Sequence, residues 1–199
     1  MARDMDLSEH IQQAFLDSAQ TIQESAEPLA GPIALAAERM VQSLLGDGKI
    51  LACGNGGSAA DAHLFASTMI NRFERDRPGL AAISLSNASA TLTSIANDFD
   101  FTQVFARQVS ALGGPGDLLL AISSSGYSRN VIEAVHVAHE KEIGVVALTG
   151  RDGGDLAEAL TEEDIIICVP ANTLARIREI HLLVIHCLCD SIDNLLLGT

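Results

Sequence analysis

Short uninterrupted runs of apolar residues alternate along the chain with longer stretches in which apolar residues recur every three or four positions. The first pattern is typical of strands buried on both faces of a sheet, and the second of helices that cover such a sheet. The alternation predicts an α/β protein with a doubly wound parallel sheet, whose ligands bind at the C-terminal ends of the strands. Strands are expected at 49–53, 80–85, 118–122, 144–149 and 164–169, and helices at about 59–73, 88–97, 101–112, 131–141 and 174–197, with a short one after 154.

Two amphipathic helices are expected before the first strand. One covers residues 7–26, and the other runs from Ile33 to about Leu45, because Gly31-Pro32 is read as the break between them. They either pack on the chain's own sheet or against another subunit, and the second alternative is preferred. No repeat or linker divides the chain, so residues 1–199 are predicted to form a single domain, with 1–46 as its N-terminal oligomerisation helices.

Two donor-rich loops leave the ends of predicted strands. Residues 54–58 read GNGGS and residues 123–128 read SSSGYS, and a helix follows each loop. Strand, small-residue turn and helix N-terminus together direct backbone N–H groups at an anion, and serine hydroxyls add donors without charge. A phosphate group is the expected ligand, although a polar turn with a serine N-cap explains the second loop equally well. The glycines do not fit the G-x-G-x-x-G dinucleotide pattern.

Composition narrows the class of partner. The formal net charge of −14 argues against direct contact with nucleic acid or an anionic membrane, since both need clustered Lys and Arg. We find no apolar run near the roughly 20 residues of a spanning helix and no signal-peptide pattern, so a cytoplasmic protein is expected. The four cysteines form no Cys-x-x-Cys pair and lie in apolar surroundings, which predicts buried, reduced thiols.

The two loops resemble those of the sugar isomerase (SIS) fold, and the similarity extends over nearly the whole chain. Its specific segments are NRFERDRPGL (71–80), SIANDF (94–99), ALTGRDGG (147–154) and ARIREIHLLVIHCLCDSIDNLL (175–196), which resemble the phosphoheptose isomerases and their relatives, the DnaA initiator-associating proteins. The resemblance implies a three-layer α/β/α sandwich and a homotetramer in which the N-terminal helices pack between subunits. It also implies a sugar-phosphate site at the subunit interface. In that site the phosphate is held by Ser123, Ser124, Ser125 and Ser128, and the sugar faces Asn55, Gly56, Ser58 and Asp98.

Isomerisation of sedoheptulose 7-phosphate moves a proton between adjacent carbons, so it needs a base, an acid and a group that polarises the oxygens. The isomerases that the chain resembles supply these with a His and a Glu four residues apart, and a Gln and a His eight apart, which together form a zinc site. The matching positions here are Leu64, Thr68, Arg178 and His186, of which only His186 is retained. A hydrocarbon, a neutral hydroxyl and a guanidinium do not favour a divalent cation, so no zinc and no other cofactor is predicted.

The replaced positions lead us to prefer a binding protein over an enzyme. The preferred hypothesis is a non-catalytic sugar-phosphate-binding tetramer that binds the replication initiator DnaA and promotes its assembly at the origin. The alternative is a phosphoheptose isomerase of lipopolysaccharide heptose synthesis with a metal-free site, in which Asp61, Glu74 or Asp98 acts as the base. Asp61 is equally explained as a carboxylate that caps a helix start. A sugar-phosphate sensor with another partner is a third hypothesis.

Other residues of interest have simpler interpretations. His63 has no glutamate four positions later, so we expect a packing or interface residue. His181 and His186 lie on an apolar helix and are expected to be hydrogen-bonded, buried histidines, although His186 is retained as a residue that touches bound sugar. Tyr127, inside the serine loop, either narrows the sugar site or lines an interface, which leaves the identity of the sugar open.

Overall fold

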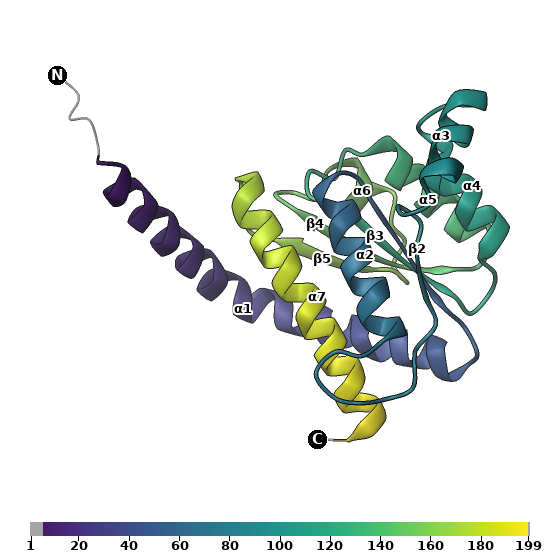
Figure 1. Cartoon of the computed structure of the whole chain (residues 1–199), viewed down its shortest axis with the longest axis horizontal. Coiled ribbons are helices and arrows are strands. Elements are labelled where there is room, and N and C mark those ends of the chain that lie inside the picture. Colours follow the sequence, from purple (N-terminus) through teal and green to yellow (C-terminus); the bar gives the residue numbers. More distant parts are fainter. Residues whose placement is uncertain (1–5, 199) are drawn as a thin grey trace.

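A single five-stranded parallel sheet forms the centre of the computed structural model, which describes residues 6–198 (Figure 1). The strand order is β2-β1-β3-β4-β5, so β3 is the central strand and pairs with β1 and β4. Every neighbouring pair is parallel, which confirms the predicted fold class. The strands are β1 (Ile50–Gly54), β2 (Ala82–Ser84), β3 (Leu118–Ser123), β4 (Gly144–Gly150) and β5 (Ile165–Val169).

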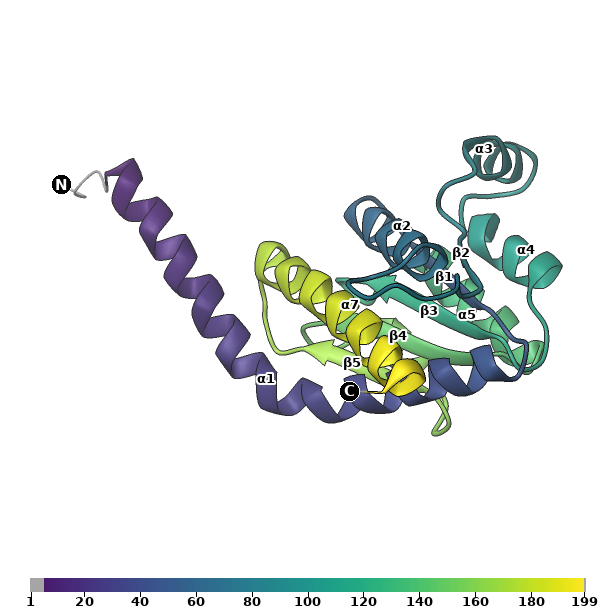
Figure 2. The same ribbon diagram turned by 60° about the horizontal axis from the view of Figure 1, so that its bottom comes forward.

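Helices cover both faces of this sheet. α1, α2 and α7 lie over one face, and α4 and α5 lie over the other, with α3 projecting beyond the sheet (Figure 2). Their bounds are α1 (Leu7–Leu45), α2 (Gly57–Ile70), α3 (Ser89–Asp98), α4 (Gln103–Leu112), α5 (Arg129–Glu140), α6 (Gly154–Glu158) and α7 (Leu174–Leu197).

Alternation along β3 divides the core into two layers. Leu118, Leu120 and Ile122 pack towards α1, α2 and α7, whereas Leu119 and Ala121 pack towards α4 and α5. Every residue of β3 is buried, as its continuous apolar run predicts. The cysteines are free thiols, and burial raises the pKa of Cys53 and Cys189 to about 12.

The N-terminal segment is one helix and not two. Pro28 and Pro32 lie inside α1, which changes direction there instead of ending (Figure 2). A proline removes one N–H from the helix ladder and bends it, but the packing of the second half on the sheet keeps the helix continuous. The second half of α1 packs on the chain's own sheet and on α7, with Leu29 and Met40 buried. In the first half, Leu7 and Phe15 are exposed.

α7 is the one helix among residues 6–198 that is long and apolar enough to cross a membrane by length and composition, which the inspection of apolar runs missed. Its apolar character has another explanation in the structure. Ile177, Ile180, Val184 and Leu188 are buried against the sheet, α1 and α2, as in the core helix of a globular domain.

Candidate functional site

The serine loop is a tight turn between β3 and α5. Ser123 ends the strand and donates a hydrogen bond from Oγ to Ser128 Oγ over 3.1 Å. Gly126 lies in the left-handed region with φ of +75°, and its N–H donates to the Ser123 carbonyl. The N–H of Tyr127 donates to Ser125 Oγ over 3.2 Å. No side chain caps the start of α5, so its first amides remain available to an anion.

The glycine loop lies beside the serine loop at the same edge of the sheet. Gly56 has φ of +54° and precedes α2, whose start also has no side-chain cap. The side chains of Asn55 and Asn130 exchange two hydrogen bonds of 2.8 Å each, which tie the glycine loop to the first turn of α5. Two uncapped helix starts therefore lie together at the C-terminal edge of the sheet, where ligands of parallel α/β proteins bind.

The residues predicted to contact the phosphate and the sugar differ in burial and in their position in the fold. Ser124 is half-buried and Ser58 is buried, both within the two loops. Asp98 is exposed at the end of α3, where it accepts a hydrogen bond from Asn97, and no hydrogen bond within residues 6–198 joins it to either loop. Tyr127 is half exposed, and its ring lies against Gly154 at the start of α6.

Free hydroxyls in the serine loop lead to a prediction about anion binding. Replacing Ser124 by Ala is expected to weaken the binding of a sugar phosphate by about 10- to 100-fold, because a charge-assisted hydrogen bond to phosphate contributes about 1.5–3 kcal/mol. Isothermal titration calorimetry on the assembled protein measures this affinity. Ser67→Ala, which changes an exposed serine on α2, is the control. An unchanged affinity in Ser124→Ala would exclude a phosphate contact at this hydroxyl.

The side chains at the four positions that correspond to the zinc site do not form a set of zinc ligands. Leu64 packs against the core, and His186 is exposed beside the ring of Phe73, at 5.7 Å between ring centroids. The expectation of a buried His186 is therefore wrong. Only His186 and the neutral hydroxyl of Thr68 carry a lone pair suited to zinc, so this set of residues does not fit the ion. That the protein works without zinc stays a prediction.

His181 behaves as a structural residue. It is fully buried on α7, and its Nε2 donates a hydrogen bond to the carbonyl of Thr149 over 3.0 Å. Burial, opposed by that hydrogen bond, lowers the pKa of His181 to about 4. The imidazole is therefore neutral at physiological pH.

Sequence reasoning missed the position of Arg178. Its guanidinium occupies the space beside Gly57 at the start of α2, where a Cβ on that glycine would lie 1.6 Å from Nη1. Arg178 Nη2 is 3.7 Å from Oδ2 of Asp61, whose side chain is only 9% exposed. Burial raises the pKa of Asp61, and the charge of Arg178 opposes that rise. Because α2 begins at Gly57, Asp61 lies beyond the first turn and does not cap the helix.

Asp61 and Arg178 open onto solvent through a cavity of 560 Å³ between α2 and α7. Its other lining residues are Leu174, Ala175, Glu179 and Leu182. This volume lies within the usual range of small-molecule sites. The cavity therefore brings a buried carboxylate and a guanidinium to a space large enough for a sugar.

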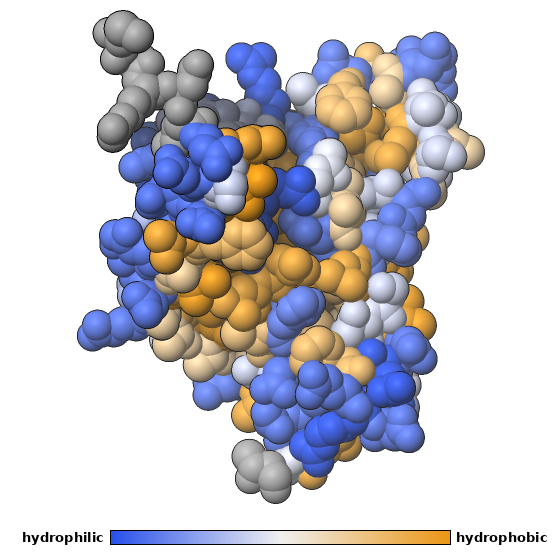
Figure 3. All heavy atoms as spheres, turned by 60° about the vertical axis from the view of Figure 1, so that its left-hand side comes forward, coloured by the Kyte–Doolittle hydropathy of each residue, from blue (hydrophilic) through white to orange (hydrophobic). Residues whose placement is uncertain are grey.

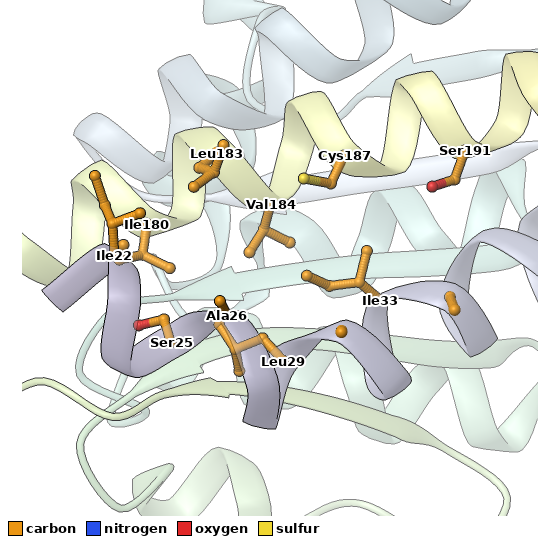
Figure 4. A pocket seen from close by; sticks show the side chains of 12 residues that line it. Ile22, Ser25, Ala26, Leu29, Ile33, Ile180, Leu183, Val184, Cys187 and Ser191 are labelled. Atoms are coloured by element: carbon orange, nitrogen blue, oxygen red, sulfur yellow. The ribbon is translucent and has the colours of Figure 1, made fainter. Parts of the chain in front are cut away.

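A second cavity of 330 Å³ lies between α1 and α7 and is lined mainly by aliphatic side chains, among them Leu29, Ile33, Leu183 and Val184 (Figure 4). Apolar side chains also gather on the outer surface over these two helices (Figure 3). The cavity carries no charged group, so it does not suit a phosphate.

The parallel sheet and the two loops at one of its edges define a sugar-isomerase domain, and a family model described as "SIS domain" matches residues 14–150. The chain belongs to the phosphoheptose isomerase family within that class. It is 61% identical over 194 residues to "Phosphoheptose isomerase" of Aromatoleum aromaticum and 60% identical to that of Azoarcus sp., with 98% of each chain covered in both cases.

Solved structures agree with this assignment. The phosphoheptose isomerase of Neisseria gonorrhoeae is 49% identical with a TM-score of 0.90, and the comparison covers 94% of this chain and 99% of that one. A phosphoheptose isomerase from Francisella tularensis is 45% identical with a TM-score of 0.93, over 96% and 100% of the two chains.

The preferred hypothesis of a non-catalytic DnaA-binding protein is therefore wrong. Relatives of about 60% identity that match along the whole chain carry the name of an isomerase, and the enzyme was the alternative hypothesis. The preference rested on three replaced side chains at the positions of the zinc ligands. The similarity of the whole chain outweighs them.

Proposed function

We propose that this protein is a phosphoheptose isomerase that interconverts sedoheptulose 7-phosphate and the corresponding aldoheptose 7-phosphate. The observation that carries the proposal is the 60–61% identity to phosphoheptose isomerases over 98% of each chain. The geometry supports it, because two uncapped helix starts and a serine-rich turn meet at the sheet edge beside a cavity of suitable size.

In this proposal the phosphate of the substrate binds to the serine loop, through the hydroxyls of Ser123, Ser124, Ser125 and Ser128 and the first amides of α5. The sugar extends towards Asn55, Gly56 and Ser58 of the glycine loop. Asp98 contributes only if α3 moves or if a second subunit brings it to the site. The reaction proceeds without zinc, because the residues at the family's zinc positions do not suit the ion.

We also propose that the protein works as a cytoplasmic homotetramer. Support comes from the first half of α1, which exposes Leu7, Ile11, Phe15 and Leu16, and from the apolar cavity between α1 and α7. Several large apolar side chains exposed together on one helix are typical of a subunit interface. The neighbouring subunit would then cover this surface and border the sugar-phosphate site.

An assay with sedoheptulose 7-phosphate tests the proposed function directly. The purified protein is expected to form the aldose phosphate at an enzyme-like rate, about 1–1000 per second per chain. Adding zinc, or removing metals with a chelator, is expected to change this rate by less than about twofold. A protein that forms no aldose phosphate under any of these conditions would contradict the proposal, whereas a rate that falls after chelation would contradict only its metal-free part.

A further inference from the structure

Building on the proposed function, we infer that Asp61 is the proton-carrying base of this isomerase and that Arg178 is the group that stabilises its oxyanion. Asp61 carries the proton between C1 and C2 of the sugar, and Arg178 stabilises the negative charge that develops on the oxygen at C2. The pair thus supplies the base and the electrophile without a metal ion, which Leu64, Thr68 and Arg178 do not bind.

Neither member of the pair has another hydrogen-bonding role. Oδ2 of Asp61 and Nε of Arg178 are buried without a hydrogen-bond partner within residues 6–198. Their separation of 3.7 Å is too long for a hydrogen bond, so they attract each other and still leave a lone pair and N–H groups available. Buried polar atoms without partners are uncommon in folded proteins, and hydrogen bonds to a bound substrate would satisfy these two.

The other carboxylate in this cavity is engaged elsewhere. Oε1 of Glu179 accepts a hydrogen bond from Arg176 over 2.7 Å, and Oε2 accepts one from Ser18 over 2.8 Å. Glu74 and Asp98, the remaining candidates for the base, are exposed and do not line the cavity. Asp61 is therefore the one carboxylate of the described cavity lining that is free to accept a proton.

Position also favours Arg178 as the group that stabilises an oxyanion. Its guanidinium lies against Gly57, so its positive charge adds to the partial positive charge of the α2 N-terminus. The Asn55–Asn130 pair holds this helix start beside the serine loop. A sugar whose phosphate lies in the serine loop is thereby directed towards Arg178.

The environment of Asp61 suits a base for a carbon acid. Burial raises the pKa of this carboxyl above its ordinary value, and a more basic carboxylate removes a proton from carbon more readily. The charge of Arg178 opposes that rise.

The proton transfers balance without any other reagent. Asp61 removes a proton from C1, the C–H electron pair forms the C1–C2 double bond, and the carbonyl pair moves to the oxygen on C2 beside Arg178. The hydroxyl proton on C1 then passes to the oxygen on C2. Finally, the carboxyl of Asp61 returns its proton to C2, and the oxygen on C1 becomes the aldehyde carbonyl.

Kinetics of four variants of the assembled protein test the inference. Asp61→Asn is expected to lower kcat by about 100- to 10,000-fold with KM changed less than about threefold, because the base is lost and the binding loops are intact. Arg178→Gln is expected to lower kcat by about 100- to 1000-fold, and Arg178→Lys to recover part of that loss. Asp190→Asn is the control, since it changes an exposed carboxylate of α7 that does not line the cavity, and its kcat is expected to stay within about threefold of the wild type.

A second measurement separates catalysis from folding. Sedoheptulose 7-phosphate that carries deuterium at C1 reports the first transfer through the loss of that deuterium to solvent. Asp61→Asn is expected to abolish this loss. If Asp61→Asn does not fold, the kcat of Arg178→Gln tests the inference instead. The Arg178 side chain is 39% exposed, so its replacement is expected to leave the fold intact. An active wild-type protein whose kcat falls less than tenfold in either variant would overturn this inference and leave the isomerase function standing. A wild-type protein without isomerase activity would overturn both.

Discussion

Asp193→Ala is expected to lower the free energy of unfolding by about 3–5 kcal/mol, because it leaves a buried guanidinium without its counter-charge. Arg77 Nε lies 2.5 Å from Oδ1 of Asp193, and the two side chains are only 1% and 2% exposed. The guanidinium also donates to the carbonyls of Thr68, Met69 and Pro78, so it ties the end of α2 and the following loop to α7. Breaking this connection loosens one side of the core.

Thermal unfolding at a fixed protein concentration measures this effect. For a chain of this length the expected loss lowers Tm by about 6–20 °C. Asp76→Ala is the matched control, because Asp76 pairs with Arg72 at 3.4 Å but is 98% exposed, and its loss is expected to change stability by less than about 1 kcal/mol. A Tm for Asp193→Ala within 2 °C of the wild type would show that the buried pair contributes little.

The double variant Arg77→Met with Asp193→Leu shows how much of the lost stability comes from leaving one charge buried alone. The rest comes from losing the attraction between the two side chains. It is expected to be more stable than the sum of the two single losses implies, since neither charge remains buried alone. The double variant is still expected to be less stable than the wild type, because three backbone carbonyls lose their hydrogen bonds from Arg77.

Local pattern predicts most of this fold. The bounds of α7, Leu174–Leu197, agree with the expected helix, and β3 differs from its expected range by one residue. Both elements have a continuous or strictly periodic apolar pattern between clear polar ends. α1 is different, because Gly31-Pro32 looks like a break and only the packing of the second half on the sheet keeps the helix continuous.

Contacts between distant parts of the chain are not accessible to local pattern. The residues around Gly57 do not predict that Arg178 lies against them. Those around Arg77 do not predict its ion pair with Asp193. The serine and glycine loops are predicted as anion sites because their chemistry is local. The sequence alone leads to the wrong preferred function, because three replaced side chains do not reveal which distant side chains share a cavity, as Asp61 and Arg178 do.

Gly126→Ala is expected to disrupt the serine loop. A Cβ at this position would lie 1.9 Å from the carbonyl oxygen of Gly153, and the backbone already has φ of +75°. The contact is with backbone, so no rotamer change relieves it, and the turn must move. The left-handed conformation costs about 1–2 kcal/mol and the overlap about 1–3 kcal/mol, which together give a loss of stability of about 2–5 kcal/mol.

Two other glycines separate these contributions. Gly116 has φ of +89° with nothing within 4 Å of an added Cβ, so Gly116→Ala measures the backbone cost alone, about 1–2 kcal/mol. Gly114 has neither a left-handed φ nor a close neighbour, and Gly114→Ala is expected to be nearly neutral. Equal losses in Gly116→Ala and Gly126→Ala would show that the contact with Gly153 is relieved without cost.

Function is expected to fall further than stability in Gly126→Ala. The hydroxyls of Ser123 and Ser125 and the first amides of α5 hold their places through this turn, and a shift of about 1 Å in a binding group lowers turnover by about 100-fold. Gly116→Ala lies in the turn before β3, at the opposite edge of the sheet, and is expected to keep its activity below the unfolding temperature. Assays of both variants at a temperature where each is folded therefore isolate the geometry of the phosphate loop from the stability of the domain.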